Sequence, residues 1–232
     1  MEPFIAVLAA IVLVFVIFFF FALVFRGFRV EALRVRGIRE LASRWEFAFT
    51  ERVRLPNEDT VTYQRDILEG RRGRRQWRVY TRVEVSTSVD VIGSRHSHRS
   101  SGTRRSESYS PWIEVVSEEL NLPEFSIDPK RSFLDNLLLK VSFLSKDVVD
   151  FSEDPAFCKE FTVRGDPKIK SFLTDTARAD LLALRPFVQW VRGKGHGIEF
   201  QRYSGRWNAK TLEALVIPLE RFLSRLERER IQ

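Results

Sequence analysis

The apolar and polar positions divide the chain into one unbroken apolar run and a long region of shorter alternating patterns. The run covers residues 4–25 and contains no charged residue, proline or glycine. At about 1.5 Å per helical residue it reaches about 33 Å, enough to cross the hydrocarbon core of a bilayer. A cleaved signal peptide would need a basic start and a small-residue cleavage site, whereas Glu2 precedes the run and bulky Phe25 and Phe28 flank its end. Residues 1–27 are therefore predicted to be a retained transmembrane anchor.

The charges beside the span predict its orientation. Six arginines lie between residues 26 and 44, while only the amino terminus and Glu2 precede the span. Arginine and lysine near a span stay on the cytoplasmic side. We therefore expect a single-pass protein of the cell (inner) membrane, with its N-terminus outside and its C-terminal domain in the cytoplasm. The single cysteine, Cys158, excludes an intrachain disulfide and suits a reducing compartment.

Residues 28–45 place apolar side chains at nearly helical spacing with arginines between them, which predicts a basic juxtamembrane helix. Such a helix either lies against anionic lipid as a stalk or packs its apolar stripe on the following domain. The two interpretations are compatible.

Four segments after this helix alternate apolar and polar residues as strands do. A glycine-bounded turn at 70–74 separates the second from the third, so the pattern predicts an antiparallel meander. The segments are 45–50, 60–70, 76–91 and 109–120.

The second half mixes strand and helix patterns without strict alternation, which is typical of the α+β class. We expect an N-terminal single transmembrane helix followed by an antiparallel sheet with packed helices. The domain, 46–232, is either one unit or two halves, 46–120 and 121–232. Its later elements are predicted as an extended segment at 122–129, a helix opened by Asp128 and Pro129 and running through 133–144, a strand at 157–165, a helix at 168–184, a hairpin of 187–193 with 197–205, and a last helix from about Ala209, kinked or divided at Pro218.

One run in this half, residues 150–184, has core and turn residues in a recurring pattern. The pattern consists of Phe157, Phe161, Val163, Asp166, Leu173 and Thr174. On these residues the chain resembles uncharacterised bacterial membrane-anchored domains of unknown function over about a third of its length. The resemblance implies an α+β domain on a bacterial membrane and no catalytic residue.

The charge balance is basic, with 38 Lys and Arg against 31 Asp and Glu. Arginines gather in the 70–74 turn region and in the polar link at residues 93–108. If both segments lie at one end of the sheet, they form a single basic surface, which we expect to remain solvated or to contact anionic lipid or an acidic partner. No recognition motif accompanies them, so nucleic acid is disfavoured. The candidate contact residues are Arg71, Arg72, Arg74, Arg75, Arg95, Arg99, Arg104 and Arg105.

Sites for cofactors, metals or catalysis are not predicted. His96 and His98 lack the third and fourth ligands that a metal site needs. Cys158 and His196 form the one available cysteine–histidine pair, but the first lies in an apolar segment and the second in a glycine-rich turn. The sequence therefore favours a membrane-anchored cytoplasmic binding domain with an unknown protein partner, held in the bilayer by residues 4–25. The alternative is a membrane-tethered hydrolase or transferase with a dispersed site.

Overall fold

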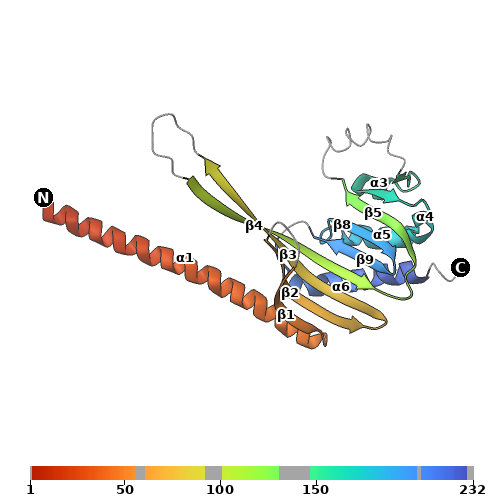
Figure 1. The fold of residues 1–232 in the computed structure, drawn as a ribbon, viewed down its shortest axis with the longest axis horizontal. Helices are drawn as coiled ribbons and strands as arrows, with labels where there is room; N and C mark the ends of the chain where they lie inside the picture. The colour runs from red at the N-terminus through yellow and green to blue at the C-terminus, as the bar shows by residue number, and fades with distance from the viewer. Residues whose placement is uncertain (1, 56–60, 92–100, 131–146, 203–204, 229–232) are drawn as a thin grey trace.

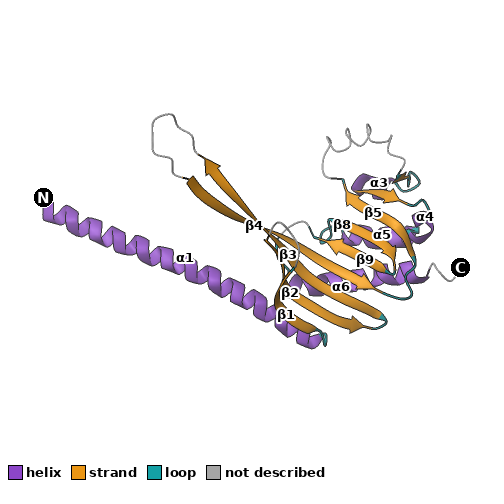
Figure 2. Cartoon of the chain, viewed as in Figure 1, coloured by secondary structure: helices purple, strands orange, loops and turns teal. Residues whose placement is uncertain are grey.

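The computed structural model consists of a long N-terminal helix that projects from a curved sheet backed by helices (Figures 1 and 2). The predicted α+β class is confirmed: the sheet has nine antiparallel strands. The structure describes residues 2–55, 61–91, 101–130, 147–202 and 205–228.

The strands of one sheet come from both halves of the chain. The β8–β9 hairpin inserts between β4 and β5, giving the order β1-β2-β3-β4-β9-β8-β5-β7-β6. The strands are β1 (Ala48–Arg54), β2 (Val61–Arg72), β3 (Arg75–Val91), β4 (Ser101–Val116), β5 (Leu122–Pro129), β6 (Val148–Val149), β7 (Phe161–Gly165), β8 (Trp190–Gly195) and β9 (Gly197–Gln201).

Helices α5 and α6 lie on one face of the sheet (Figure 1). The face of α6 turned to the sheet is wholly apolar, and it packs with alternate strand residues such as Ile113 and Phe200 in one core. Pro218 does not divide α6, which continues past it as one helix. The described helices are α1 (Glu2–Arg44), α3 (Pro155–Glu160), α4 (Ile169–Phe172), α5 (Asp175–Leu184) and α6 (Ala209–Arg228).

Three predicted elements differ from the structure. Residues 157–160 of the expected 157–165 strand belong to α3, because Asp154 caps this helix by accepting a hydrogen bond from the Phe157 amide at 3.0 Å. The expected 168–184 helix is broken into α4 and α5 at Leu173. Asp128 and Pro129 end β5, and residues 133–144 lie outside the described part of the chain.

Helix α1 is continuous from the apolar run to the domain. Its apolar part is long enough to cross a membrane, and the most apolar stretch from Leu13 onward is not buried in the domain. Toward its C-terminal end, Ile38 and Leu41 are fully buried in the core. The juxtamembrane segment is therefore the packed first helix of the domain and also an extension of the apolar helix.

A buried ion pair fixes α1 to the sheet. Arg34 of α1 donates to Asp66 at 2.7 Å and to the Trp207 carbonyl at 2.8 Å. Asp66 is completely buried, at an irregularity of β2 where its φ is +53°. Glu31, one turn before Arg34, pairs with Arg206 at 2.6 Å. We call these contacts the α1 junction.

Candidate functional site on the open face of the sheet

The face of the sheet opposite α5 and α6, here called the open face, carries polar and aromatic side chains. Strand β4 shows the alternation: Ile113 and Val115 are buried in the core, whereas Trp112, Glu114 and Val116 are half-buried or exposed. Because neighbouring strands are in register, their side chains on this face form rows across the sheet.

One row is charged and places two carboxylates next to each other. Glu114 lies opposite Glu199, which lies opposite Arg192 on the next strand. On the other side Arg78 lies opposite Glu114, but its closer ion pair is with Glu69, at 2.7 Å against 3.8 Å. Directly opposite residues have Cβ atoms about 4.5–5.5 Å apart, so the two like charges repel each other.

The next row is aromatic. Tyr80 and Trp112 stack with ring centroids 6.4 Å apart, and Trp190 meets Trp112 edge-on at 5.4 Å. The Arg192 guanidinium lies 3.8 Å from the centre of the Trp190 ring. The Tyr80 hydroxyl donates to Glu114 at 2.6 Å and so joins the aromatic row to the charged row.

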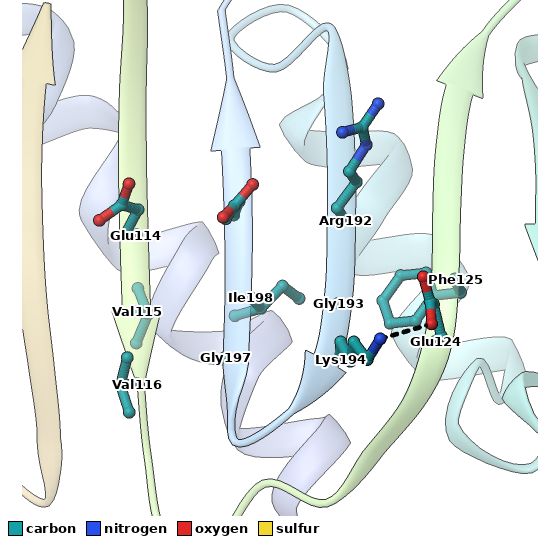
Figure 3. Close-up of a pocket in the computed structure, with 11 residues that line it drawn as sticks. Glu114, Val115, Val116, Glu124, Phe125, Arg192, Gly193, Lys194, Gly197 and Ile198 are labelled. Atoms are coloured by element: carbon teal, nitrogen blue, oxygen red, sulfur yellow. Dashed lines mark ion pairs between the residues drawn. The ribbon is translucent and has the colours of Figure 1, made fainter. Parts of the chain in front are cut away.

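Beside the charged row the open face is hollowed into a cavity of about 360 Å³ (Figure 3). Glu114 and Glu199 stand at one side, and Gly197, which has no side chain, leaves space next to them. Lys194 and Glu124 form a 2.8 Å ion pair along the opposite wall. The cavity therefore has carboxylates as hydrogen-bond acceptors and the cationic side chains of Arg192 and Lys194 as donors around a glycine surface.

Glu199 is the least satisfied charge of the cavity. Burial, followed by repulsion from Glu114, raises its pKa, and Arg192 opposes this shift. Within the described residues, its carboxylate has no hydrogen bond and no ion pair within 4.0 Å. The pKa of Tyr80 is also raised, mainly by burial and then by its hydrogen bond to Glu114.

Replacing Glu199 with glutamine should stabilise the protein at neutral pH. Folding raises the pKa of this carboxyl, so its ionised form opposes folding at pH values above the folded pKa. We expect Glu199→Gln to raise the free energy of unfolding by about 1 kcal/mol or less at pH 7. The gain should disappear as the pH falls below 4.5, the ordinary pKa of a glutamate carboxyl, because the wild-type carboxyl is then protonated in both the folded and the unfolded state. Thermal unfolding at both pH values tests this, with exposed Glu51→Gln as the control; an equal gain at both would contradict it.

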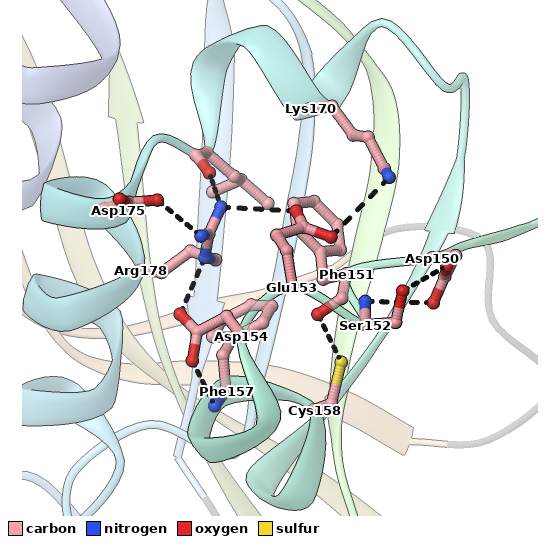
Figure 4. A network of polar contacts seen from close by, with 11 residues as sticks. Asp150, Phe151, Ser152, Glu153, Asp154, Phe157, Cys158, Lys170, Asp175 and Arg178 are labelled. Carbon is pink, nitrogen blue, oxygen red and sulfur yellow. Dashed lines mark hydrogen bonds and ion pairs between the residues drawn. The ribbon is translucent and has the colours of Figure 1, made fainter.

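A second polar network lies at the far end of the sheet (Figure 4). The buried Arg178 of α5 donates to Asp154 at 2.8 Å, to Asp175 at 2.6 Å and to the Leu173 carbonyl at 2.8 Å. It thereby ties the start of α3 to the break between α4 and α5. Each donor has a partner within the fold, so we interpret this network as structural.

Cys158 and His196 have separate partners. The Cys158 thiol donates to the Phe151 carbonyl at 2.9 Å beside a cavity of about 230 Å³, and burial raises its pKa. His196, in the β8–β9 turn, lies 2.6 Å from the Leu120 carbonyl through Nδ1. A thiol with a raised pKa and no imidazole partner in the described part of the chain is a poor nucleophile. Among the described residues no group of three or more His, Cys, Asp or Glu could hold a metal ion; His96 and His98 lie outside them.

The arginines of the turn between β2 and β3 are mostly paired with carboxylates. This neutralises much of the basic charge expected there. Arg71 is exposed, and the pairs are Arg72 with Glu220, Arg74 with Glu119, and Arg75 with Glu227.

The expected single basic surface is wrong, because consecutive turns of a meander lie at opposite ends of the strand they share. The β2–β3 turn and the β3–β4 link are separated by the full length of β3, 17 residues or about 56 Å. Arg104 and Arg105 lie on β4 opposite Ser88 and Thr87. Arg95 and Arg99 lie outside the described residues.

The open-face residues were missed in the sequence. The alternation around Trp112 and Glu114 signals a strand with one polar face, but it does not show which strand is its neighbour. Glu199 and Arg192 come from a hairpin about 80 residues later, and their meeting with Glu114 depends on the insertion of β8 and β9 beside β4.

Comparisons with known proteins show the fold alone. No family model and no curated protein matches the sequence. Among solved structures, the crystal structure of the mycobacterial trehalose monomycolate transport factor A, TtfA, is similar, with a TM-score of 0.52 and 6% sequence identity. The similarity covers 83% of this chain and 93% of that one. The chain therefore has a fold similar to that of TtfA.

Proposed function

We propose that this chain is a membrane-anchored binding domain that presents the open face of its sheet to a protein partner at the cytoplasmic side of the inner membrane. The observation that carries the proposal is the continuity of α1, which contains the apolar span and also enters the domain core at Ile38 and Leu41. Such a helix holds the domain at the membrane without a flexible linker between the two. The half-buried, unpaired carboxylate of Glu199 marks the part of the open face where a partner's hydrogen-bond donor would bind.

The fold similarity suggests the setting in which the domain works. TtfA is described as a trehalose monomycolate transport factor. We propose that this chain likewise serves a lipid-transport process as an accessory factor. In this role it would bind other proteins of the process, and it needs no catalytic group of its own.

Contact with anionic lipid is proposed for the arginines next to the span, Arg26 and Arg29. The turn holding Arg71 and Arg74 lies near the C-terminal end of α1, where the Arg72 guanidinium lies 5.4 Å from the centre of the Trp45 ring. Arg44 is 18 residues beyond Arg26, or about 27 Å along the helix. With a Debye length of about 8 Å at physiological salt, the turn is too distant to sense lipid head groups when α1 is upright.

The open face is tested by carboxylate footprinting of the full chain. Carbodiimide labelling of Glu199 and Glu114 should fall several-fold in native membranes relative to the purified chain in detergent, because a bound partner excludes the reagent. Glu213, on the opposite side of the molecule in α6, is the internal control and should label equally in both preparations. Equal labelling of Glu199 in the two preparations would refute binding at this face.

The orientation is tested by cysteine labelling of intact cells. In a Cys158→Ser background, Ile217→Cys places a thiol at a site 64% exposed on α6, and Glu2→Cys places one before the span. A membrane-impermeant maleimide should label residue 2 in intact cells and residue 217 after permeabilisation alone. Labelling of residue 217 from outside would reverse the orientation.

The carboxylate pair also favours the alternative, a membrane-tethered hydrolase. A carboxyl with a raised pKa beside a second carboxyl group is an arrangement used for general acid–base catalysis. In that case hydrolysis of one member of an ester and glycoside panel should require both Glu114 and Glu199. The binding proposal expects glutamine variants at these positions to leave any such background activity unchanged.

A further inference from the structure

The outer half of the β3–β4 hairpin forms a ribbon that leaves the sheet. Beyond the last pair of β2 with β3, Val61 with Val85, strand β3 pairs with β4 and with no other strand of the described residues. We call residues 86–91 with 101–106 the arm. Ten of these twelve residues are polar, charged or glycine, and Asp90, Arg104 and Arg105 are among them. Both outer edges of a two-stranded ribbon carry unpaired backbone N–H and C=O groups.

The base of the arm is held beside the membrane end of the α1 junction. Arg206 pairs with Glu31 at 2.6 Å, and its guanidinium lies 4.0 Å from the centre of the Tyr109 ring. Tyr109 belongs to β4 directly below the arm and packs with Val83 and Val85. Glu31 is six residues from Phe25, the end of the apolar run, or about 9 Å along the helix.

From this base the arm and α1 extend in the same general direction, toward the N-terminal end of the helix (Figure 1). Residues 86–91 alone span about 20 Å as a strand. The arm is therefore more than long enough to pass the level of Phe25, even when it is inclined to α1 by as much as about 45°. The described ribbon then reaches the depth of the hydrocarbon that surrounds α1.

Lipid cannot surround a ribbon of this kind. Backbone groups without hydrogen-bond partners are strongly destabilising in hydrocarbon, so open-edged strands occur at membrane depth only within protein or beside water. The charged residues of the arm add to this cost. An arm lying flat among the head groups would have to run across the direction of α1. This arm instead extends in the same general direction as α1 (Figure 1).

We infer that the arm docks against a polar, water-accessible groove of an integral membrane protein that sits beside α1. That protein supplies the hydrogen-bond partners that the ribbon edges lack. The interaction is separate from the open face, which lies farther from the membrane along β4. Loss of one interaction does not require loss of the other.

The arm is tested by quenching of a fluorophore in the full chain, expressed from its own chromosomal position. Ser88→Cys in the Cys158→Ser background is labelled with an environment-sensitive dye. In native membranes we expect quenching by aqueous iodide to be several-fold weaker than in nanodiscs of the same lipids that hold this chain alone, and lipid-attached quenchers to have no effect in either. Equal iodide quenching in both would show an arm free in water, and quenching by lipid-attached groups would show an arm in lipid; either result overturns the inference.

Two controls separate docking from changes in the domain. Thr50→Cys, exposed on β1 at the other end of the domain, should be quenched by iodide equally in both preparations. A shortened chain that joins Ser86 to Ser106 through an Asn-Gly turn keeps the core intact. We expect the wild-type chain to migrate as a larger complex on native gels of solubilised membranes, and the shortened chain to lose the arm-bound protein from this complex while keeping the footprint of Glu199. A shortened chain that retains the wild-type complex would overturn arm docking.

Discussion

Replacing Arg34 with methionine should lower the free energy of unfolding by about 3–5 kcal/mol. Arg34 pairs with Oδ2 of Asp66, which is completely buried and whose Oδ1 atom has no hydrogen-bond partner among the described residues. Removing one member of a buried pair leaves an uncompensated charge in the interior. In a domain of this size the midpoint of thermal unfolding should fall by roughly 10 °C, measured by tryptophan fluorescence of the full chain in detergent.

The double variant Arg34→Met with Asp66→Asn is the matched control. Asparagine removes the stranded charge, and it tolerates the positive φ at this position better than most residues. We expect the second substitution to restore at least half of the lost stability. If Arg34→Met alone is as stable as the wild type, α1 is not fixed to the sheet by this pair.

Gly165→Ala should be the second large effect, with a loss of about 3 kcal/mol or more. Gly165 ends β7 with φ +120°, a conformation that residues with a side chain rarely adopt. An added Cβ would also lie 2.3 Å from the Glu124 carbonyl oxygen and 2.8 Å from the Phe125 Cα. Since both are backbone atoms of β5, the strand pair must separate or shift. The loss is measured as above, by thermal unfolding of the full chain.

Gly73→Ala distinguishes strain from contact in this measurement. Gly73 also has a positive φ, +62°, but nothing lies within 4 Å of an added Cβ. This variant should lose only about 1 kcal/mol. Equal losses at the two positions would show that the close approach of β5 to Gly165 does not matter for stability.

Local patterns predicted the elements whose stability depends on their own sequence. The apolar run, the β2–β3 hairpin around Gly73 and the β8–β9 hairpin were found because periodicity and turn glycines mark them directly. The apolar stripe of α6, with Leu212, Leu219 and Leu226, marked the last helix in the same way.

Features that depend on distant residues could not be predicted. Residues 157–160 were predicted as part of a strand because Phe157 and Phe161 suit either state. The Asp154 cap and the packing of Phe157 against Phe151 favour the helix. The pairing partner of a strand is not encoded in its own alternation, so Glu114 gave no sign that Glu199 would lie beside it. The arginines of the turn were expected to be solvated or to contact lipid or an acidic partner, because the α6 carboxylates that pair with Arg72 and Arg75 come about 150 residues later.

The insertion of β9 beside β4 constrains how the protein is synthesised. Strand β4 ends at Val116, but the partner of its Trp112–Val116 segment is Gly197–Gln201, about 85 residues later. At about 5–20 residues per second, several seconds pass before that partner leaves the ribosome. During this time the first four strands, already attached to the membrane by α1, have an unpaired edge and lack α6 to cover their apolar side. Products that terminate before β9 should therefore misassemble and be degraded at the membrane, where the full-length chain accumulates.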